Sequence, residues 1–320
     1  MLSNELTKRL GIQHPIQCGT MQWLSKAELV GAVADAGALA CIASAINPDP
    51  EALREEIDKT RAITRRPFGV NVSLFPSLSA SDIGKLISTV AQCGVGILET
   101  AGRSPEPYRD QIKEAGLFHI HKCARIRDAI KAQSLGVDAI SVVGMECGGH
   151  PGEAGLGSMV LIPKVVKSVE CPVIGGGGFC DGRSLAAGLA LGAQCINMGT
   201  RFILTKECPG HPDLKQFYLD SQAADTMLVM GSLKNTGRVL RTPWSEEVAR
   251  LENQGAGLEE LAPYISGQLA RQGWADGGKD KGLYYAGQVV ERCQDLPSVD
   301  QLISRTVAEA QEVINGLAGA

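Results

Sequence analysis

The chain has 320 residues, of which 44% are hydrophobic and 21% charged, and its formal net charge is −4. These proportions are typical of a folded globular protein with one large domain or two ordinary ones. The small negative charge and the 4% content of aromatic residues argue against a nucleic-acid-binding surface, which needs a basic patch or stacking side chains. We therefore expect a small-molecule ligand and no nucleic-acid partner.

Cysteine spacing and the N-terminal residues indicate the compartment. The 10 cysteines never form a C-x-x-C pair, so the sequence predicts neither a zinc site nor a disulfide framework. Residues 1–8 lack an apolar signal core, and no apolar run approaches the length of a membrane span. We expect a cytoplasmic protein with reduced thiols and no membrane partner.

Short apolar runs alternate with helical patterns along the first 200 residues, and a glycine turn precedes many of the apolar runs. This alternation is typical of right-handed βαβ units around a parallel sheet. The pattern predicts eight strands: 16–18, 39–43, 68–74, 95–100, 118–122, 139–143, 173–175 and 195–198. The helical patterns between them include 51–63, 81–91, 125–135, 156–169 and 184–191.

Eight such units predict an α/β fold of the (β/α)8 TIM barrel type. A doubly wound open sheet is the alternative, but the residues after the first strand, Gly19-Thr20-Met21-Gln22-Trp23, do not match a dinucleotide-binding turn. After Arg201 the strand pattern stops. The later runs, 213–224, 246–252, 258–269, 284–293 and 299–317, are typical of helices. We expect a barrel over residues 1–210 and, over residues 211–320, a C-terminal helical subdomain that caps the barrel, with a final helix packed on it.

Ligands of such barrels bind at the C-terminal ends of the strands. The two glycine-rich loops there are the strongest signal: Gly175 to Gly178 ends the seventh strand, and Gly199-Thr200 ends the eighth. Backbone N–H groups of such turns form an anion-binding nest, and Thr200 adds a hydroxyl. They predict a phosphate-bearing ligand, with a merely flexible turn as the alternative for the first loop.

Other strand ends carry polar candidates. Lys122 ends the fifth strand, where its ammonium could hold a polarised ring or an anion, or else extend to solvent. Asn71 ends the third strand, followed by Ser73 and Pro76, and could bind the edge of a flat ligand or cap the turn.

The loop after the sixth strand, Glu146-Cys147-Gly148-Gly149-His150-Pro151-Gly152-Glu153, places one imidazole among three glycines. Glycines allow a flat ligand to approach their amides, and Pro151 disfavours helix at His150. We expect His150 to face a cavity and to act in acid–base chemistry; the alternative is a solvated surface turn. We expect His14 and His211 to lie in turns. His119 and His121 share a strand face without a third ligand nearby, so no metal site is predicted.

With these residues assembled, the chain resembles the nitronate monooxygenases, formerly called 2-nitropropane dioxygenases, which are FMN-dependent barrels. It is most similar to the bacterial subgroup that includes an NADH:quinone reductase, and FMN-dependent enoyl-acyl-carrier reductases share the Gly-Gly-His segment. The resemblance spans nearly the whole chain and is carried by Pro15-Ile16, Gly19, Met21-Gln22-Trp23, Phe68-Gly69-Val70-Asn71, His121-Lys122-Cys123, Glu146 to Glu153, Gly177-Gly178-Phe179, Asp181-Gly182-Arg183, Asn197 to Phe202 and Ser232 to Thr236.

The resemblance implies that FMN places its phosphate on Gly177, Gly178, Gly199 and Thr200. It implies further that the isoalloxazine lies near Gly19, Thr20, Met21, Asn71 and Lys122, with the substrate between flavin and His150. Gly149 and Met198 complete the expected cofactor-binding set.

Two residues depart from the family pattern. Thr20 stands where close relatives tend to have glycine, which could narrow the approach of the flavin. Val143 stands where an acidic residue is expected at the end of the sixth strand, which bears on the basicity of His150.

The resemblance implies an FMN-dependent oxidoreductase that oxidises alkyl nitronates or nitroalkanes with O2. The alternative is a quinone or enone reductase that uses NADH or NADPH on the same flavin, with the loop around Pro76 and the C-terminal helices gating entry. A third reading, from another class, is a barrel that binds a phosphate-bearing metabolite without flavin. A homodimer is left open.

Overall fold

The computed structural model describes residues 2–74 and 80–319. Pro76, which the sequence placed in a gating loop, lies outside these residues.

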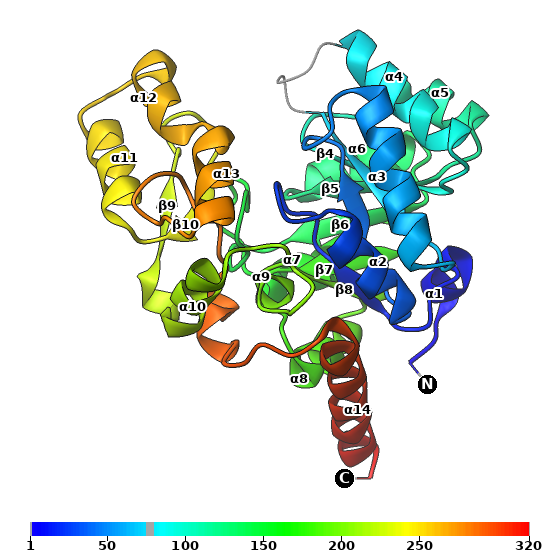
Figure 1. Ribbon diagram of the computed structural model, residues 1–320. Coiled ribbons are helices and arrows are strands. Elements are labelled where there is room, and N and C mark those ends of the chain that lie inside the picture. Colours follow the sequence, from blue (N-terminus) through cyan, green and yellow to red (C-terminus); the bar gives the residue numbers. More distant parts are fainter. Residues whose placement is uncertain (1, 75–79, 320) are drawn as a thin grey trace.

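Eight parallel strands form the centre of the molecule, and the predicted (β/α)8 barrel is confirmed (Figure 1). Consecutive strands pair from β2 to β8, and β8 pairs with β1. The ring closes between β1 and the residues before β2, where Cys18 N–H donates to Leu39 O (2.7 Å) and Leu39 N–H to Ile16 O (3.0 Å). The strands are β1 (Ile16–Cys18), β2 (Cys41–Ala43), β3 (Gly69–Ser73), β4 (Ile97–Ala101), β5 (Phe118–Cys123), β6 (Ala139–Val143), β7 (Val173–Gly176) and β8 (Cys195–Met198).

Helices surround the barrel and follow the predicted order. Local signals fix their starts: Asp49 accepts hydrogen bonds from Glu51 N and Ala52 N, ahead of Pro50 in the first turn of α3. The helices of this part are α1 (Glu5–Leu10), α2 (Ala27–Asp35), α3 (Pro50–Ile63), α4 (Ala80–Gln92), the 3-10 turn η1 (Glu106–Tyr108), α5 (Arg109–Glu114), α6 (Ile126–Ser134), α7 (Ser158–Val166), α8 (Gly182–Ala190) and the short α9 (Thr200–Ile203).

The barrel interior changes from apolar to polar along its axis. At the N-terminal end, Leu6 and Leu10 of α1 pack against a strand layer that includes Ile97 and Ile120, so α1 plugs this end. Side chains two residues further along a strand point to the same face. Glu99 and Lys122 therefore follow Ile97 and Ile120 inside the barrel, toward the opposite mouth.

The C-terminal subdomain is mostly helical, as expected, but it also contains an antiparallel hairpin that the sequence analysis missed. Its strands are only four residues each, and the turn between them holds Met230 and Lys234 at positive φ (64° and 51°). The turn contains Gly231, but it lacks the Asn-Gly or Asp-Gly pair that marks a tight two-residue hairpin. The elements are α10 (Pro212–Asp220), η2 (Ala223–Asp225), β9 (Thr226–Val229), β10 (Gly237–Leu240), α11 (Pro243–Asn253), α12 (Leu258–Ile265) and α13 (Gly267–Asp276).

The helix expected over 284–293 is wrong for its first half. Leu240 N–H donates to Tyr284 O (2.8 Å), and Val239 bridges Tyr285, so this segment lies extended beside β10. Only the 3-10 turn η3 (Gln288–Arg292) is helical. The pairing with the hairpin overrides the local helical pattern.

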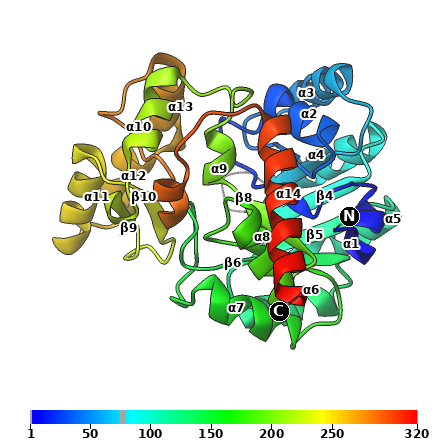
Figure 2. The same cartoon turned by 90° about the horizontal axis from the view of Figure 1, so that it is seen from below.

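The last helix, α14 (Val299–Ala318), packs on the barrel rather than on the subdomain (Figures 1 and 2). It lies mainly against α8 and also contacts α2. A Cβ on Gly182 would come within 2.4 Å of Ala310 N, so the two helices approach closely only because residue 182 is glycine. We therefore propose to count α14 as the eighth helix of the barrel, although it follows the subdomain in sequence.

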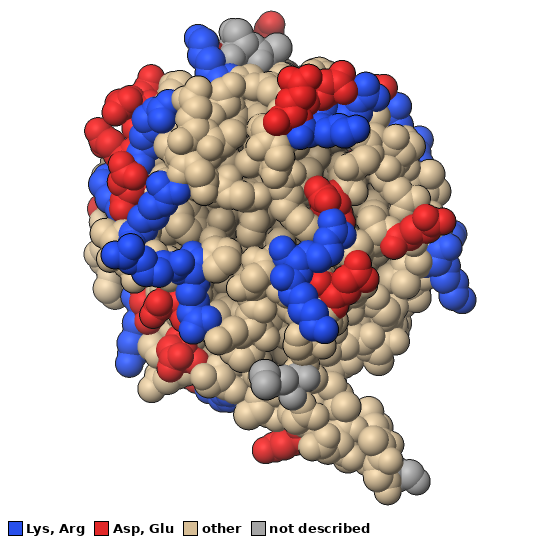
Figure 3. Space-filling view, turned by 90° about the vertical axis from the view of Figure 1, so that its right-hand side faces the viewer, with Lys and Arg blue, Asp and Glu red and all other residues tan. Residues whose placement is uncertain are grey.

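The surface over the barrel helices carries interspersed basic and acidic side chains, and the end of α14 projects beyond the body (Figure 3). Within residues 2–74 and 80–319, none of the helices combines the length and apolar character needed to cross a membrane.

Candidate active site

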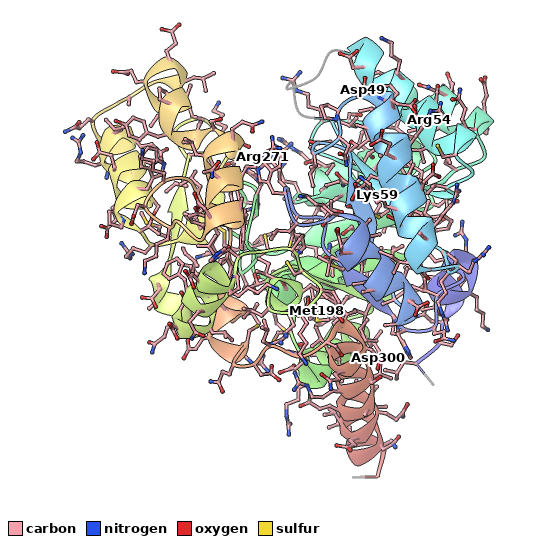
Figure 4. All side chains as sticks on the ribbon, in the orientation of Figure 1. Asp49, Arg54, Lys59, Met198, Arg271 and Asp300 are labelled. Carbon is pink, nitrogen blue, oxygen red and sulfur yellow. The ribbon has the colours of Figure 1, made fainter. Side chains whose placement is uncertain are left out.

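A cavity of about 630 Å³ opens at the C-terminal ends of the strands, and the subdomain forms part of its wall. All but one of the predicted site residues line it: Gly19, Thr20, Met21, Asn71, Lys122, Gly149, His150, Gly177, Gly178, Gly199 and Thr200. The exception is Met198, whose side chain belongs to the core (Figure 4). Its carbonyl accepts a hydrogen bond from Gly19 N–H (2.8 Å) and so positions the loop after β1.

The loop after β7 needs its glycines. Gly177 and Gly178 have φ values of +97° and +79°, which side-chain-bearing residues rarely adopt. A Cβ on Gly177 would also lie 2.8 Å from Ser158 Oγ. That hydroxyl lies 3.0 and 2.8 Å from the carbonyl oxygens of Gly176 and Gly177, so the start of α7 holds the turn in place.

The loop after β8 leaves space for a ligand. A Cβ on Gly199 would meet no protein atom within 4 Å, so the volume beside this glycine belongs to the cavity. The first N–H groups of α9 have no acceptor within their helix. Thr200 Oγ accepts from Gly287 N–H (2.9 Å), which leaves its own proton to donate.

These two loops fit a phosphate group. Glycine turns at positive φ, open space beside Gly199, a helix start and a hydroxyl proton that can be donated are features that bind phosphate at this place in barrels. The open cavity beyond them, bordered by Thr20, Asn71 and Lys122, has room for a flat ring. The residues present therefore fit FMN.

The floor of the cavity contains a buried carboxylate that the sequence analysis did not single out. Glu99 is fully buried and accepts four hydrogen bonds from the side chains of four different segments. The donors are Gln17 Nε2 (2.7 Å), Thr20 Oγ1 (2.9 Å), Asn71 Nδ2 (2.7 Å) and Lys122 Nζ (3.2 Å). A charged residue two positions after Ile97, on the same face of an apolar strand, was the signal that could have identified it.

The network keeps Glu99 ionised. Burial alone would raise the pKa of this carboxyl, but the ammonium of Lys122 and the hydrogen bonds from Asn71, Gln17 and Thr20 outweigh it, and the pKa is lowered. Thr20, the residue that departs from the family pattern, directs its hydroxyl proton at Glu99.

The loop that carries His150 is fixed to the subdomain. Gly149 and Arg238 of β10 exchange backbone hydrogen bonds (Gly149 N to Arg238 O, 3.3 Å; Arg238 N to Gly149 O, 2.7 Å). The carboxylate of Glu153 accepts from Thr236 N (3.0 Å) and Thr236 Oγ1 (2.7 Å). A Cβ on Gly148 would lie 2.7 Å from the backbone of Ala286. This wall therefore depends on pairing with residues more than eighty positions away.

His150 presents its ring to the cavity and packs on Tyr285, with ring centroids 5.4 Å apart. His150 is solvent-exposed at the cavity mouth, and the partial desolvation by the surrounding residues lowers the pKa of its imidazole, while Glu153 opposes this shift. The ring is therefore neutral at pH 7, in the form that accepts a proton. Val143 also lines the cavity, so the carboxylate that acts on His150 comes from its own loop rather than from the end of β6.

The loop after β1 also contacts the subdomain. Trp23 has φ +70°, and its Nε1 donates to Gly267 O at the start of α13 (2.8 Å). Arg271 of α13 lies on the side facing the barrel (Figure 4), with its guanidinium 5.2 Å from the centre of the Trp23 ring. This strained tryptophan joins the two halves of the cavity rim.

Within the described ranges, no three His, Cys, Asp or Glu side chains are grouped so as to hold a metal ion. His119 and His121 lie on the same strand, each with a ring nitrogen 2.8 Å from Thr100 Oγ1. Burial lowers the pKa of His119 to about 3 and that of His121 to about 4, so both rings are neutral.

Comparison with protein families identifies a match over nearly the whole chain. The family model described as "Nitronate monooxygenase" matches residues 3–88 and 77–309.

Individual relatives cover nearly the whole chain. The chain is 31% identical to a "(3aS,4S,5R,7aS)-5-hydroxy-7a-methyl-1-oxo-octahydro-1H-indene-4-carboxyl-CoA dehydrogenase" of Rhodococcus jostii, over 99% of this chain and 98% of the relative. It is 27% identical to a "Probable nitronate monooxygenase" of Staphylococcus haemolyticus, over 98% of each. Among solved structures, FabK from Thermotoga maritima superposes with a TM-score of 0.93 at 33% identity, covering 100% of this chain and 99% of FabK. The barrel, the glycine loops and these matches agree: the chain belongs to the nitronate monooxygenase family and is an FMN-type oxidoreductase.

Proposed function

We propose that the protein is an FMN-dependent oxidoreductase in which His150 moves the proton on a carbon next to an electron-withdrawing group. One observation carries this: His150 faces the cavity with a lowered pKa, as a neutral proton acceptor. It is the only histidine among the described residues of the cavity lining. FMN, when bound, supplies the electron acceptor or donor.

The chain's own residues divide the remaining tasks. Gly177, Gly178, Gly199 and Thr200 would hold the phosphate through backbone N–H groups and one hydroxyl. Thr20, Asn71 and Lys122 would bind the polar edge of the ring. His150, on the wall that faces this floor, would take or return the proton of the substrate.

Nitronate monooxygenase activity is the first candidate. The family model and the probable nitronate monooxygenases among the relatives support it. A neutral imidazole can accept the α-proton of a nitroalkane, whereas an anionic nitronate needs no base and only has to be oriented.

The second candidate is oxidation or reduction of a carbon–carbon bond beside a thioester or ketone, with NADH, NADPH or a quinone as redox partner. The relative from Rhodococcus jostii, by its name a carboxyl-CoA dehydrogenase, favours this at higher identity than the probable nitronate monooxygenase. The subdomain adds apolar wall residues, such as Ile265 and Leu283, to the cavity that would also hold FMN, and these residues suit a large apolar substrate. Proton transfer at the α-carbon is common to both candidates.

Anaerobic stopped-flow absorbance distinguishes the candidates. The FMN-loaded protein is mixed separately with propyl-2-nitronate, 2-nitropropane, NADH, NADPH and a saturated acyl-CoA. Flavin bleaching by the nitro compounds alone supports the monooxygenase. Bleaching by a nicotinamide or by the acyl-CoA supports the second candidate. A protein that binds no flavin would overturn both.

A further inference from the structure

The strongest feature outside the proposed mechanism is the network around Glu99. Its members come from β1, the loop after β1, β3, β4 and β5, and all their hydrogen bonds to Glu99 are between 2.7 and 3.2 Å. Glu99 itself does not line the cavity, whereas Thr20, Asn71 and Lys122 do. The carboxylate thus lies behind three groups that face the ligand.

Glu99 determines which hydrogen-bonding groups the cavity presents. The single hydroxyl proton of Thr20 points at Glu99, so its oxygen is left as an acceptor. Asn71 gives one N–H to Glu99 and keeps its carbonyl oxygen and a second N–H. Lys122 gives one of its three N–H groups and keeps two. The polar edge of a flavin carries two carbonyl oxygens that flank an N–H group, and this mixed set of acceptors and donors complements it.

Glu99 also determines the charge of the floor. Its pKa is lowered, so the carboxylate is ionised and lies 3.2 Å from the ammonium of Lys122, whose side chain is only 18% exposed. The buried pair has no net charge. Without Glu99, the same ammonium would face the ligand as an uncompensated cation in a poorly solvated site, where its field is strong.

We infer that Glu99 is a positioning residue of the flavin site: it orients Thr20, Asn71 and Lys122, and it cancels the charge of Lys122 at the cavity floor. This inference rests on the proposed binding of FMN. Reduction of flavin adds negative charge to the ring, so a free cation beneath it stabilises the reduced form more than a neutral ion pair does. Glu99 therefore keeps the reduction potential of the bound flavin lower than Lys122 alone would set it.

A double-mutant cycle tests the inference. It compares the wild type, Glu99→Gln, Lys122→Met and the double variant. The glutamine keeps an acceptor for Thr20 or Lys122 but carries no charge. The midpoint potential of bound FMN is measured by spectroelectrochemical titration, together with the dissociation constants of oxidised and reduced FMN for each protein.

Glu99→Gln should shift the potential upward, with reduced FMN gaining at least tenfold in affinity relative to oxidised FMN, equivalent to ~30 mV for a two-electron couple. The double variant has a neutral floor again and should return toward the wild-type potential, which a purely structural role of Glu99 would not produce. An unchanged or lower potential in Glu99→Gln with FMN bound overturns the inference alone.

Two further outcomes are decisive. A wild type that binds no FMN overturns the proposed function together with the inference. If Glu99→Gln does not fold, the comparison of Lys122→Met with the double variant decides. The Lys122→Met protein should then show either a lower potential than the double variant or a proton taken up by the unpaired Glu99. That proton would appear as an additional pH dependence of the potential, beyond the one that flavin reduction itself gives in the double variant. The same potential at every pH in both would overturn the inference.

Discussion

The floor and the wall of the cavity are built in different ways. The floor consists of side chains at the ends of barrel strands, joined through one buried carboxylate. The wall around His150 is a glycine-rich loop held by backbone pairing with a hairpin that lies far away in sequence. A floor whose side chains share one carboxylate suits a cofactor that stays bound, whereas a wall built from two segments far apart in sequence can differ between relatives that act on different substrates. The family match and the different names of the relatives agree with this division.

Removing the imidazole should give the largest effect. His150→Ala should lower turnover of neutral nitroalkanes or acyl thioesters by ~10²–10⁴-fold, the usual contribution of a general base. Turnover of an anionic nitronate should fall much less, because it has no proton to lose. Steady-state kinetics on 2-nitropropane and propyl-2-nitronate checks this. Equal losses on both substrates would mean that His150 is not the base.

Acid should destabilise the barrel through the strand that carries Lys122. His119 and His121 bind protons at pH ~6.5 when unfolded, but their folded pKa values are about 3 and about 4. The unfolded chain therefore binds more protons below pH 6.5, and the free energy of unfolding should fall from pH 6.5 to about 4, by at most ~1.4 kcal/mol per pH unit for each ring.

Urea denaturation at a series of pH values measures this loss. Replacing both histidines with glutamine should flatten the dependence between pH 6.5 and 4. Glu99, with its lowered pKa, contributes a separate loss that begins only in more acidic solution, below the pKa of an unfolded glutamate. An identical slope in the glutamine variant above pH 4 would contradict the assignment.

Filling the space beside the phosphate loop should weaken the binding of FMN without unfolding the protein. Gly199→Ala adds a methyl group where no protein atom lies within 4 Å, at a φ of −99° that alanine accepts. FMN affinity should fall at least tenfold, ~1.4 kcal/mol, as measured by fluorescence titration of the apoprotein. Gly96→Ala is the matched control, because its Cβ also meets no atom within 4 Å but residue 96 lies outside the cavity lining. Equal FMN affinity in the two variants would remove Gly199 from the phosphate site.

Loosening the wall should have the smallest effect. Glu153→Gln removes one acceptor for Thr236 and the charge that raises the pKa of His150. We expect a rise of a few-fold in KM, ~1 kcal/mol, and a shift of the acid limb of the kcat/KM profile to lower pH. FMN affinity should stay unchanged.

Glu252→Gln serves as the control for the wall. Glu252 accepts from Met230 N (2.6 Å) and Ser232 N (3.0 Å) on the same hairpin, but it does not line the cavity. Its pH profile should match that of the wild type. A shift in both variants would attribute the effect to the hairpin as a whole rather than to the charge beside His150.

The same division explains what the sequence could predict. Glycine runs and polar residues at strand ends are local signals, so the barrel and the cavity-lining positions such as Gly177, Lys122 and His150 could be inferred. Glu99 was missed because its hydrogen-bond partners come from four other segments, and the sequence of its own strand does not reveal them. The hairpin and the extended segment at Tyr284 were missed because long-range pairing, rather than local preference, fixes them. The cofactor roles of the lining residues stay predictions until FMN binding is measured.

The position of α14 has a consequence for synthesis of the protein. A ribosome completes the eighth strand about one hundred residues before it reaches the helix that packs between α8 and α2. Until then, the apolar face of α8 that packs on α14 stays exposed, because the barrel cannot be completed before the whole subdomain has been synthesised. Non-local contacts of this kind slow folding and leave partly folded chains prone to association. The twenty residues of α14, although remote from the cavity, are thus the segment on which completion of the barrel depends.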